Sequence, residues 1–146
     1  IAGGPYRGGR AVEELVSTAS LPKTILALAG VDVGDAMIGE NLLDVVEKKA
    51  DNRPNEIFAQ ISESRVGRCI RTARYTYSVY APGVNGGAAA ASDRYADDFL
   101  YDMEHDPHQL DNVVADPAYA QVKAELRKRL LDWIWQAEGA RPVITD

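Results

Sequence analysis

The chain has 146 residues, a net charge of −6 and a single cysteine, and hydrophobic residues make up 46% of it. This length is enough for one domain with a modest core. The acidic balance argues against a nucleic-acid-binding protein, and no apolar run is long enough to span a membrane. One cysteine and two histidines are too few for a closed zinc site, and they leave the cellular compartment open.

The N-terminal segment is rich in glycine. The stretch GGPYRGGR, residues 3–10, lacks the Lys-Ser/Thr ending of a P-loop, so we interpret it as a plain loop rather than a phosphate cradle. The sequence starts at Ile1, and no leader pattern stands before it. We therefore expect it to be a piece of a longer protein.

Two short helices are predicted next. In SLPKTILALAG, residues 20–30, Ser20 is a candidate N-cap, Pro22 suits the first turn and Gly30 can end the helix. MIGENLLDVVEK, residues 37–48, predicts a second helix. The apolar positions are Ile25, Leu28 and Ala29 in the first helix, and Leu42, Leu43 and Val46, expected to face inward, in the second.

The hydrophobic period then changes from helical to two. Four segments alternate between side chains for two opposite faces, as antiparallel strands do. They are EIFAQIS (residues 56–62), GRCIRT (67–72), RYTYSVY (74–80) and DDFLYDME (97–104). In the last of these, Phe99 and Tyr101 should share one face and Leu100 the other. The small residues of 81–93 predict a flexible surface loop without packing capacity.

The longest element is a C-terminal helix over residues 116–139. Asp116 is its expected N-cap, with Pro117 at the first helical position and Gly139 at the end. An apolar stripe comprises Tyr119, Val122, Leu126, Leu130, Trp133 and Ala137, and we interpret Trp133 as core rather than part of a cofactor site. Lys123, Arg127 and Lys128 are expected to point away from the core.

Together these elements predict an α+β fold. It would hold about four antiparallel strands with the long helix across one face, preceded by the two short helices.

The acidic stretch at residues 98–117 admits two readings. Asp106 and Gln109 have the spacing of a capping box, and Asn112 suits a left-handed exit from a short helix. Alternatively, His105 and His108 could bind a metal together with a carboxylate. Because His105 precedes the expected cap, capping is the favoured interpretation.

The same stretch carries a resemblance to a known family. The closing segment of the sulfatases of the alkaline phosphatase superfamily resembles FLYDMEHDPHQLDNVVADP. Two further segments of those enzymes resemble ELVSTASLPKTILALAGV and GRCIRTARYTYSVY, and the segments follow one another in the same order along both chains. MIGENLLDVV and GGPYRGGR are also similar to sulfatase segments. The departures are Ser20, Asn41, Gln109 and Val113, where the family usually has Asp, Ser, Glu and Leu.

The resemblance implies a division of the chain and a chemistry. Residues 1–50 would be the tail end of a catalytic α/β domain, and residues 51–146 a C-terminal sheet subdomain. A sulfatase of this kind uses a formylglycine, made in a Cys-x-Pro/Ala-x-Arg motif, and a divalent metal, usually calcium. Cys69 does not fit that motif, so we expect it to be a buried or half-buried structural residue.

The chain is therefore expected to be the C-terminal fragment of a sulfatase-like hydrolase whose parent hydrolyses sulfate esters. The fragment alone is predicted to be inactive, with no catalytic residue, metal or cofactor of its own. Its main partner would be the missing N-terminal catalytic domain. Loops of this subdomain can border the substrate, and the best candidates are Glu63, Arg65 and Arg68 around the first hairpin turn, where the alternative is a solvated turn.

Two other interpretations stay open. The chain could be a stand-alone binding module or a degenerate, non-catalytic relative of the sulfatases. Because both faces of the predicted sheet carry large side chains and one helix covers only one of them, the fragment could also form a homo-oligomer through exposed apolar surface.

Overall fold

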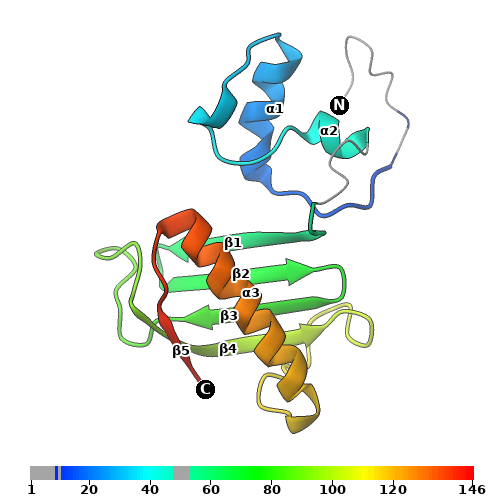
Figure 1. Ribbon diagram of the computed structural model, residues 1–146. Coiled ribbons are helices and arrows are strands. Elements are labelled where there is room, and N and C mark those ends of the chain that lie inside the picture. Colours follow the sequence, from blue (N-terminus) through cyan, green and yellow to red (C-terminus); the bar gives the residue numbers. More distant parts are fainter. Residues whose placement is uncertain (1–8, 10, 48–52) are drawn as a thin grey trace. The chain divides into compact units, whose positions relative to one another are not determined.

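The computed structural model describes residues 9, 11–47 and 53–146 (Figure 1). The chain divides into two compact units, Ile1–Asn55 and Glu56–Asp146. Most of the predicted glycine-rich loop at residues 3–10 and the end of the second predicted helix at Lys48 lie outside the described residues. No helix in the described ranges has the length and apolar character needed to cross a bilayer.

The first unit contains short helices. Its elements are the 3-10 helix η1 (Thr18–Ser20), α1 (Leu21–Leu28), the 3-10 helix η2 (Gly34–Ala36) and α2 (Leu42–Val46). Both predicted helices are present. Asn41 caps α2, because its Oδ1 accepts from Leu43 N at 3.1 Å. Leu42 and Val45 are buried, whereas Val46 is half-buried.

Hydroxyl groups hold α1 to the segment before α2. The prediction that the Ser20 side chain caps α1 is wrong, because this hydroxyl makes no capping hydrogen bond and instead accepts from Glu40 N at 3.1 Å. Thr24 Oγ1 accepts from Leu42 N at 3.0 Å, and Ser20 and Thr24 are both buried. The apolar stripe is left outside, since Ile25 is 62% exposed. Polar contacts therefore organise the inner side of this helix.

The second unit is built on a five-stranded sheet. Its strands are β1 (Glu56–Ser62), β2 (Val66–Thr72), β3 (Tyr75–Tyr80), β4 (Arg94–Asp102) and β5 (Val143–Thr145), in the spatial order β1-β2-β3-β4-β5. The first four are antiparallel, which confirms the α+β prediction. The parallel strand β5 was not predicted, because three residues are too few to show a period of two.

The long helix α3 (Ala120–Glu138) crosses one face of this sheet (Figure 1). It follows the 3-10 helix η3 (Pro117–Tyr119), and Asp116 caps this start as predicted, accepting from Ala118 N at 2.9 Å. Gly139 ends α3 in the left-handed conformation, with φ of 67°.

The core lies between α3 and the sheet. The register places Phe58, Ile70, Tyr77 and Leu100 side by side on four strands. Buried residues from α3 complete the cluster: Leu126, Leu130 and Ile134. Trp133 packs against it as predicted and stacks on Phe58, with ring centroids 6.4 Å apart. We call this side of the sheet the helix face.

The opposite side of the sheet is here called the open face. Because side chains alternate along a strand, residues next to those of the helix face point to this side. Phe99 and Tyr101 share the open face and Leu100 lies on the helix face, as predicted. The open face carries Ile57, Ala59, Ile61, Cys69, Arg71, Ser78, Tyr80, Phe99 and Tyr101.

Charged residues of α3 reach the sheet, which corrects one prediction. Lys123 and Arg127 do not point away from it. Lys123 Nζ lies 2.8 Å and Arg127 Nη2 2.9 Å from the carboxylate of Asp97 on β4, which also accepts from the Tyr77 hydroxyl. Lys128 is exposed, as predicted. The Asp97 carboxylate on the helix face pairs with these two cations. Such a pairing cannot be predicted from hydrophobic periodicity.

Candidate functional site

The three candidate border residues lie at the end of the sheet where β1 turns into β2. Glu63 and Arg65 belong to the turn and are exposed, whereas Arg68 is on β2 and only 2% exposed. We call residues 62–65 the hairpin turn. The structure thus separates two accessible side chains from one that lies inside the unit.

Arg65 is oriented by two contacts on the open face. Its guanidinium pairs with the carboxylate of Asp98, where Nη1 and Oδ1 are 3.2 Å apart. It also lies over the Tyr80 ring, 5.8 Å from the centroid. The side chain is still 44% exposed. Arg65 is therefore accessible from solvent while its guanidinium is paired with a carboxylate of the same unit.

Arg68 is occupied inside the chain. Its Nε lies 2.5 Å from Oε1 of Glu138, at the end of α3, and its Nη1 donates to the carbonyl of Gly67 at 2.8 Å. Its Nη2 donates to the carbonyl of Ala90 at 2.8 Å. These acceptors use the guanidinium fully, so Arg68 ties the hairpin to α3 and to the loop at 81–93.

That loop is packed rather than free, which corrects the expectation that it lacks packing capacity. Gly86 is buried, and a Cβ at this position would lie 2.5 Å from the carbonyl oxygen of Glu63. Ser62 Oγ donates to the carbonyl of Ala90 at 2.6 Å. Small residues therefore let the loop approach the backbone of the hairpin turn closely. Composition alone did not distinguish close packing from flexibility.

The acidic stretch is organised by Asp102 rather than by a capping box. Arg74 holds this buried carboxylate with two hydrogen bonds, of 2.9 and 2.7 Å, and His105 Nδ1 lies 3.0 Å from it. The Arg74 guanidinium keeps the pKa of Asp102 well below its usual range, against the opposing effect of burial. Tyr119 Oη also lies 3.4 Å from the carboxylate, at the start of the final helical segment.

No helix begins at Asp106, so the predicted capping box is wrong. The Asp106 carboxylate instead accepts from Asp111 N at 2.9 Å, and Gln109 takes the left-handed conformation that we expected of Asn112. Asn112 uses its side chain on β4, where Oδ1 accepts from Leu100 N at 3.0 Å and Nδ2 donates to the Asp98 carbonyl. The Asn112 side chain thus takes the place of a neighbouring strand as hydrogen-bond partner of β4. These bonds lie beside the β-bulge, where the register between β3 and β4 shifts at Ser78 and Val79.

The alternative metal reading gains no support from this geometry. In the parts of the chain that the structure describes, no group of three His, Cys, Asp or Glu side chains could hold a metal ion. His105 is engaged with Asp102, and His108 is exposed.

Cys69 is half-buried on β2, as predicted. Burial raises the pKa of its thiol to about 11, so the thiol is protonated at neutral pH. This environment is unfavourable for a nucleophile.

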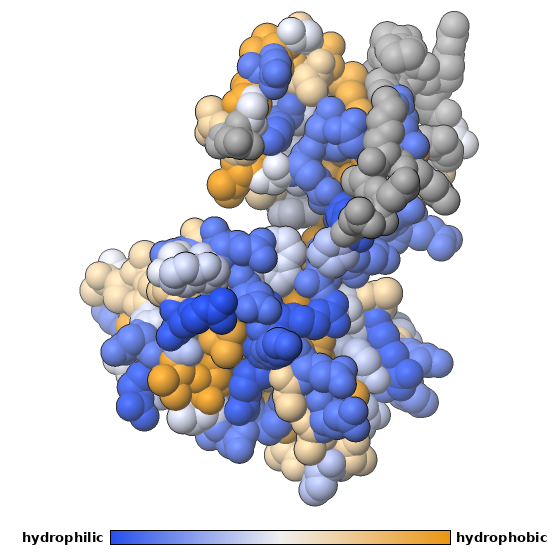
Figure 2. Space-filling view, viewed as in Figure 1, coloured by the Kyte–Doolittle hydropathy of each residue, from blue (hydrophilic) through white to orange (hydrophobic). Residues whose placement is uncertain are grey.

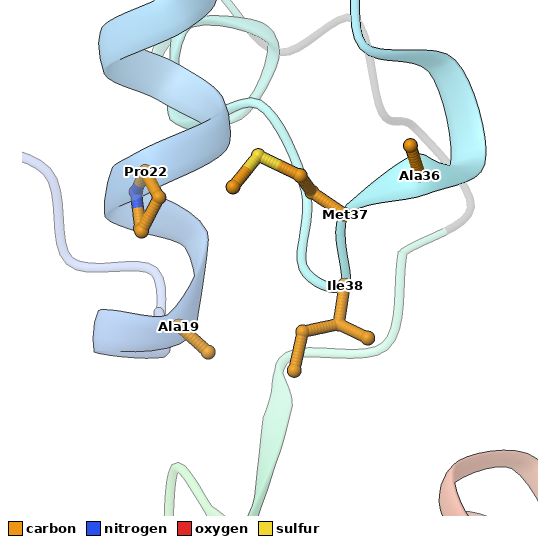
Figure 3. A pocket seen from close by; sticks show the side chains of 5 residues that line it. All are labelled: Ala19, Pro22, Ala36, Met37 and Ile38. Atoms are coloured by element: carbon orange, nitrogen blue, oxygen red, sulfur yellow. The ribbon is translucent and has the colours of Figure 1, made fainter.

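A shallow apolar pocket lies in the first unit. Ala19 and Pro22 line one side, and Ala36, Met37 and Ile38 the other, with the Met37 side chain extending toward the first helix (Figure 3). No charged side chain is among these five, so the pocket offers apolar contact only.

Comparison with known proteins places this geometry in a family. Residues 4–136 match the family described as the C-terminal region of N-sulphoglucosamine sulphohydrolase. The chain is 32% identical over 127 residues to a delta 4,5-hexuronate-2-O-sulfatase of Bacteroides thetaiotaomicron. The matched region covers 83% of this chain and 24% of that protein. It is also 43% identical over 37 residues, 25% of the chain and 7% of that protein, to the human N-sulphoglucosamine sulphohydrolase.

Solved structures agree on the fold. A protein assigned to the sulfatases from Bacteroides thetaiotaomicron VPI-5482 superposes with a TM-score of 0.62 at 27% identity, over 82% of this chain and 24% of that one. A protein solved in complex with its substrate D-glucosamine-2-N,6-O-disulfate superposes with a TM-score of 0.66 at 23% identity, over 84% of this chain and 24% of that one. The chain spans about a quarter of the length of these relatives.

Proposed function

Since this chain belongs to the sulfatase family represented by the C-terminal region of N-sulphoglucosamine sulphohydrolase, we propose that it serves as the C-terminal part of a longer enzyme that hydrolyses sulfate esters. The observation that carries the proposal is the family match, which runs through residues 4–136. The chain's share of its relatives, about a quarter, leaves room for a catalytic domain elsewhere in the protein.

The reactive groups of such an enzyme would come from outside this chain. The sulfatases that it resembles use a formylglycine as nucleophile and a calcium ion that neutralises sulfate oxygens. The described residues of this chain fit neither group: Cys69 is half-buried with a raised thiol pKa, and no acidic cluster suits a metal. The chain alone is therefore proposed to be inactive.

The contribution of this chain would be to the border of the substrate site. Arg65 offers a positive charge that is oriented and accessible, and Glu63 stands beside it in the hairpin turn. In this proposal Arg68 does not touch substrate but holds the turn in place through Glu138 and the loop at 81–93. An oriented guanidinium is suited to recognising a sulfate or carboxylate group.

The names of the matched proteins suggest the substrate class. They refer to a sulfated hexuronate and to sulfated glucosamine, which are both anionic sugars. We propose that the longer protein containing this chain also acts on a sulfated, anionic sugar.

The test is desulfation by the longer polypeptide encoded with this chain. It should carry a Cys-x-Pro/Ala-x-Arg motif and release sulfate from a sulfated hexuronate or glucosamine, and replacing the motif cysteine should abolish release. Arg65→Ala should raise KM with little change in kcat, whereas Arg141→Ala, at another exposed arginine of this unit, should leave KM unchanged. An open reading frame that begins near Ile1 would instead favour a stand-alone module.

A further inference from the structure

We infer that Asp98 is a positioning residue: it fixes the guanidinium of Arg65 so that one edge of this group stays free to bind an anionic group of the substrate. The inference deepens the proposed function and rests on it, because it names the residue that would orient Arg65 at the substrate border. A β-bulge in β4 carries it.

This β-bulge sets the direction of the Asp98 side chain. Tyr95 and Leu100 are both buried in the core on the helix face, although strict alternation sends residues an odd number of positions apart to opposite faces. The register explains this, because it shifts between Ser78 and Val79 of β3 and leaves Asp98 of β4 out of the pairing. Asp98 is thus the extra residue of the bulge, and its side chain comes to the open face.

Asn112 holds the backbone of the bulge in place. Its Nδ2 donates to the Asp98 carbonyl and its Oδ1 accepts from Leu100 N, both at 3.0 Å. The N–H of Val113 also donates to the Leu100 carbonyl, at 2.9 Å. The main chain on both sides of Phe99 is therefore bound, and the backbone that carries the Asp98 side chain is fixed.

Asp98 binds the end of the Arg65 guanidinium. Its Oδ1 accepts from Nη1 at 3.2 Å, and its Oδ2 pairs with Nη2. The guanidinium also lies over the Tyr80 ring, 5.8 Å from the centroid. Asp98 does not use the edge of the guanidinium that carries Nε, and this edge has further N–H donors. A planar guanidinium can bind a second oxyanion there with two parallel hydrogen bonds.

The effect of Asp98 on substrate binding would be orientation rather than attraction. Its negative charge offsets part of the positive charge of Arg65, so the pair does not raise the overall attraction for an anion. A guanidinium that is already fixed, however, loses less conformational entropy when a substrate binds. It also accepts only an anion that approaches its free edge, which favours one orientation of the sugar.

Arg141 has the same kinds of partner without a β-bulge. It pairs with Asp132 through one contact of 3.4 Å and lies over the Trp135 ring, 5.4 Å from the centroid. Trp135 belongs to α3, and the side of the second unit that bears α3 is mainly hydrophilic (Figure 2). The Asp132 side chain is 47% exposed, against 17% for Asp98. Arg141 therefore forms a solvated surface pair, whereas the pair of Arg65 is built into the sheet.

Kinetics of the longer protein on a sulfated sugar test the inference. Asp98→Asn keeps the shape of the side chain but places an amide NH2 group against the Nη donors of Arg65, and Asp132→Asn is the matched control at Arg141. We expect Asp98→Asn to raise KM at least about fivefold with little change in kcat, and Asp132→Asn to change neither. In an Arg65→Ala background, Asp98→Asn should have no further effect on KM, because it acts through Arg65.

Chemical labelling of arginine gives a readout that does not depend on activity. A dicarbonyl reagent adds across the two Nη atoms of an arginine side chain, and these are the atoms of Arg65 that Asp98 binds. Peptide mass spectrometry should find Arg65 labelled at least about fivefold faster in Asp98→Asn than in the wild-type protein. Labelling of Arg141 should be the same in both.

The two readouts separate this inference from the proposed function. If Arg65→Ala raises KM but Asp98→Asn behaves like Asp132→Asn, the positioning role is overturned and the border site stands. An unchanged KM in Arg65→Ala would overturn the border site and with it the role of Asp98 toward substrate. If the longer protein releases no sulfate, the proposed function fails, and equal labelling of Arg65 in Asp98→Asn and wild type would show that Asp98 does not fix Arg65 either.

Discussion

Asp102 joins three segments of the second unit, two of which are distant from it in sequence. Its buried carboxylate contacts Arg74 in the turn between β2 and β3, His105 in the turn after β4, and Tyr119 at the start of the final helical segment. The guanidinium of Arg74 lowers its pKa, so the carboxylate is charged over the whole neutral and mildly acidic range. At the residue scale, this carboxylate connects the acidic stretch to the turn at Arg74 and to the final helical segment.

The lowered pKa of Asp102 predicts a pH dependence of stability. The folded-state pKa lies below the unfolded value, so the stabilisation is fully present above about pH 4 and is lost as the pH falls further. Asp102→Asn should lower the free energy of unfolding at pH 7 and flatten its decline below pH 4, measured by urea denaturation at several pH values. Asp111→Asn is the control, and an equal flattening in that variant would refute the assignment.

Gly86 sets how closely the loop can approach the hairpin turn. Gly86→Ala would place a methyl group 2.5 Å from the carbonyl oxygen of Glu63, so backbone must move. We expect a loss of about 1–3 kcal/mol in urea denaturation, as for other overpacked sites. Gly87→Ala is the matched control, because its methyl group would meet only the Asn85 side chain, at 3.3 Å. Equal stability of the two variants would show that the loop does not press on the turn.

At the element scale, the end of α3 is fixed to the hairpin by an ion pair. Glu138→Ala would leave the guanidinium of Arg68 buried without its carboxylate partner. The expected cost is about 3–5 kcal/mol, measured by chemical denaturation. The double variant Arg68→Met, Glu138→Leu removes both charges and should recover most of this loss. A double variant as unstable as Glu138→Ala would mean that the cost does not come from the orphaned charge.

The start of the final helical segment depends on Asp116. Its Oδ1 accepts from Ala118 N at 2.9 Å, so Asp116→Ala should destabilise the chain by about 1 kcal/mol in thermal or urea unfolding. Asp116→Ser keeps an oxygen that can accept this bond and should retain most of the stability. An alanine variant with wild-type stability would show that this cap contributes nothing.

Periodicity was a sound guide where one physical effect dominates. The stripe through Leu126 and Leu130 follows burial, and the structure has a helix there. The alternation at residues 56–62 correctly predicts a strand, although burial along β1 does not alternate. The failures come from polar pairing between distant segments. Nothing local to α3 shows that Asp97 will draw Lys123 and Arg127 inward.

At the scale of the whole molecule, the sequence identified the family, whereas the hairpin turn remains a candidate site whose internal contacts the sequence did not predict. The motifs from residue 98 to 117 indicated a sulfatase, and the family match agrees. The hairpin turn was selected for its charged residues, yet burial of Arg68 depends on Glu138, 70 positions away. Gly86 was missed because close packing of backbone on backbone has no signature in composition.

We propose that the longer protein is a sulfatase and that this chain does not carry its chemistry. Hydrolysis of an aryl sulfate in the presence of calcium, measured side by side for the 146-residue chain and the longer polypeptide, tests it most directly. We predict sulfate release by the longer polypeptide and only background release by the chain alone. Turnover by the isolated chain that disappears in Cys69→Ser would contradict the claim.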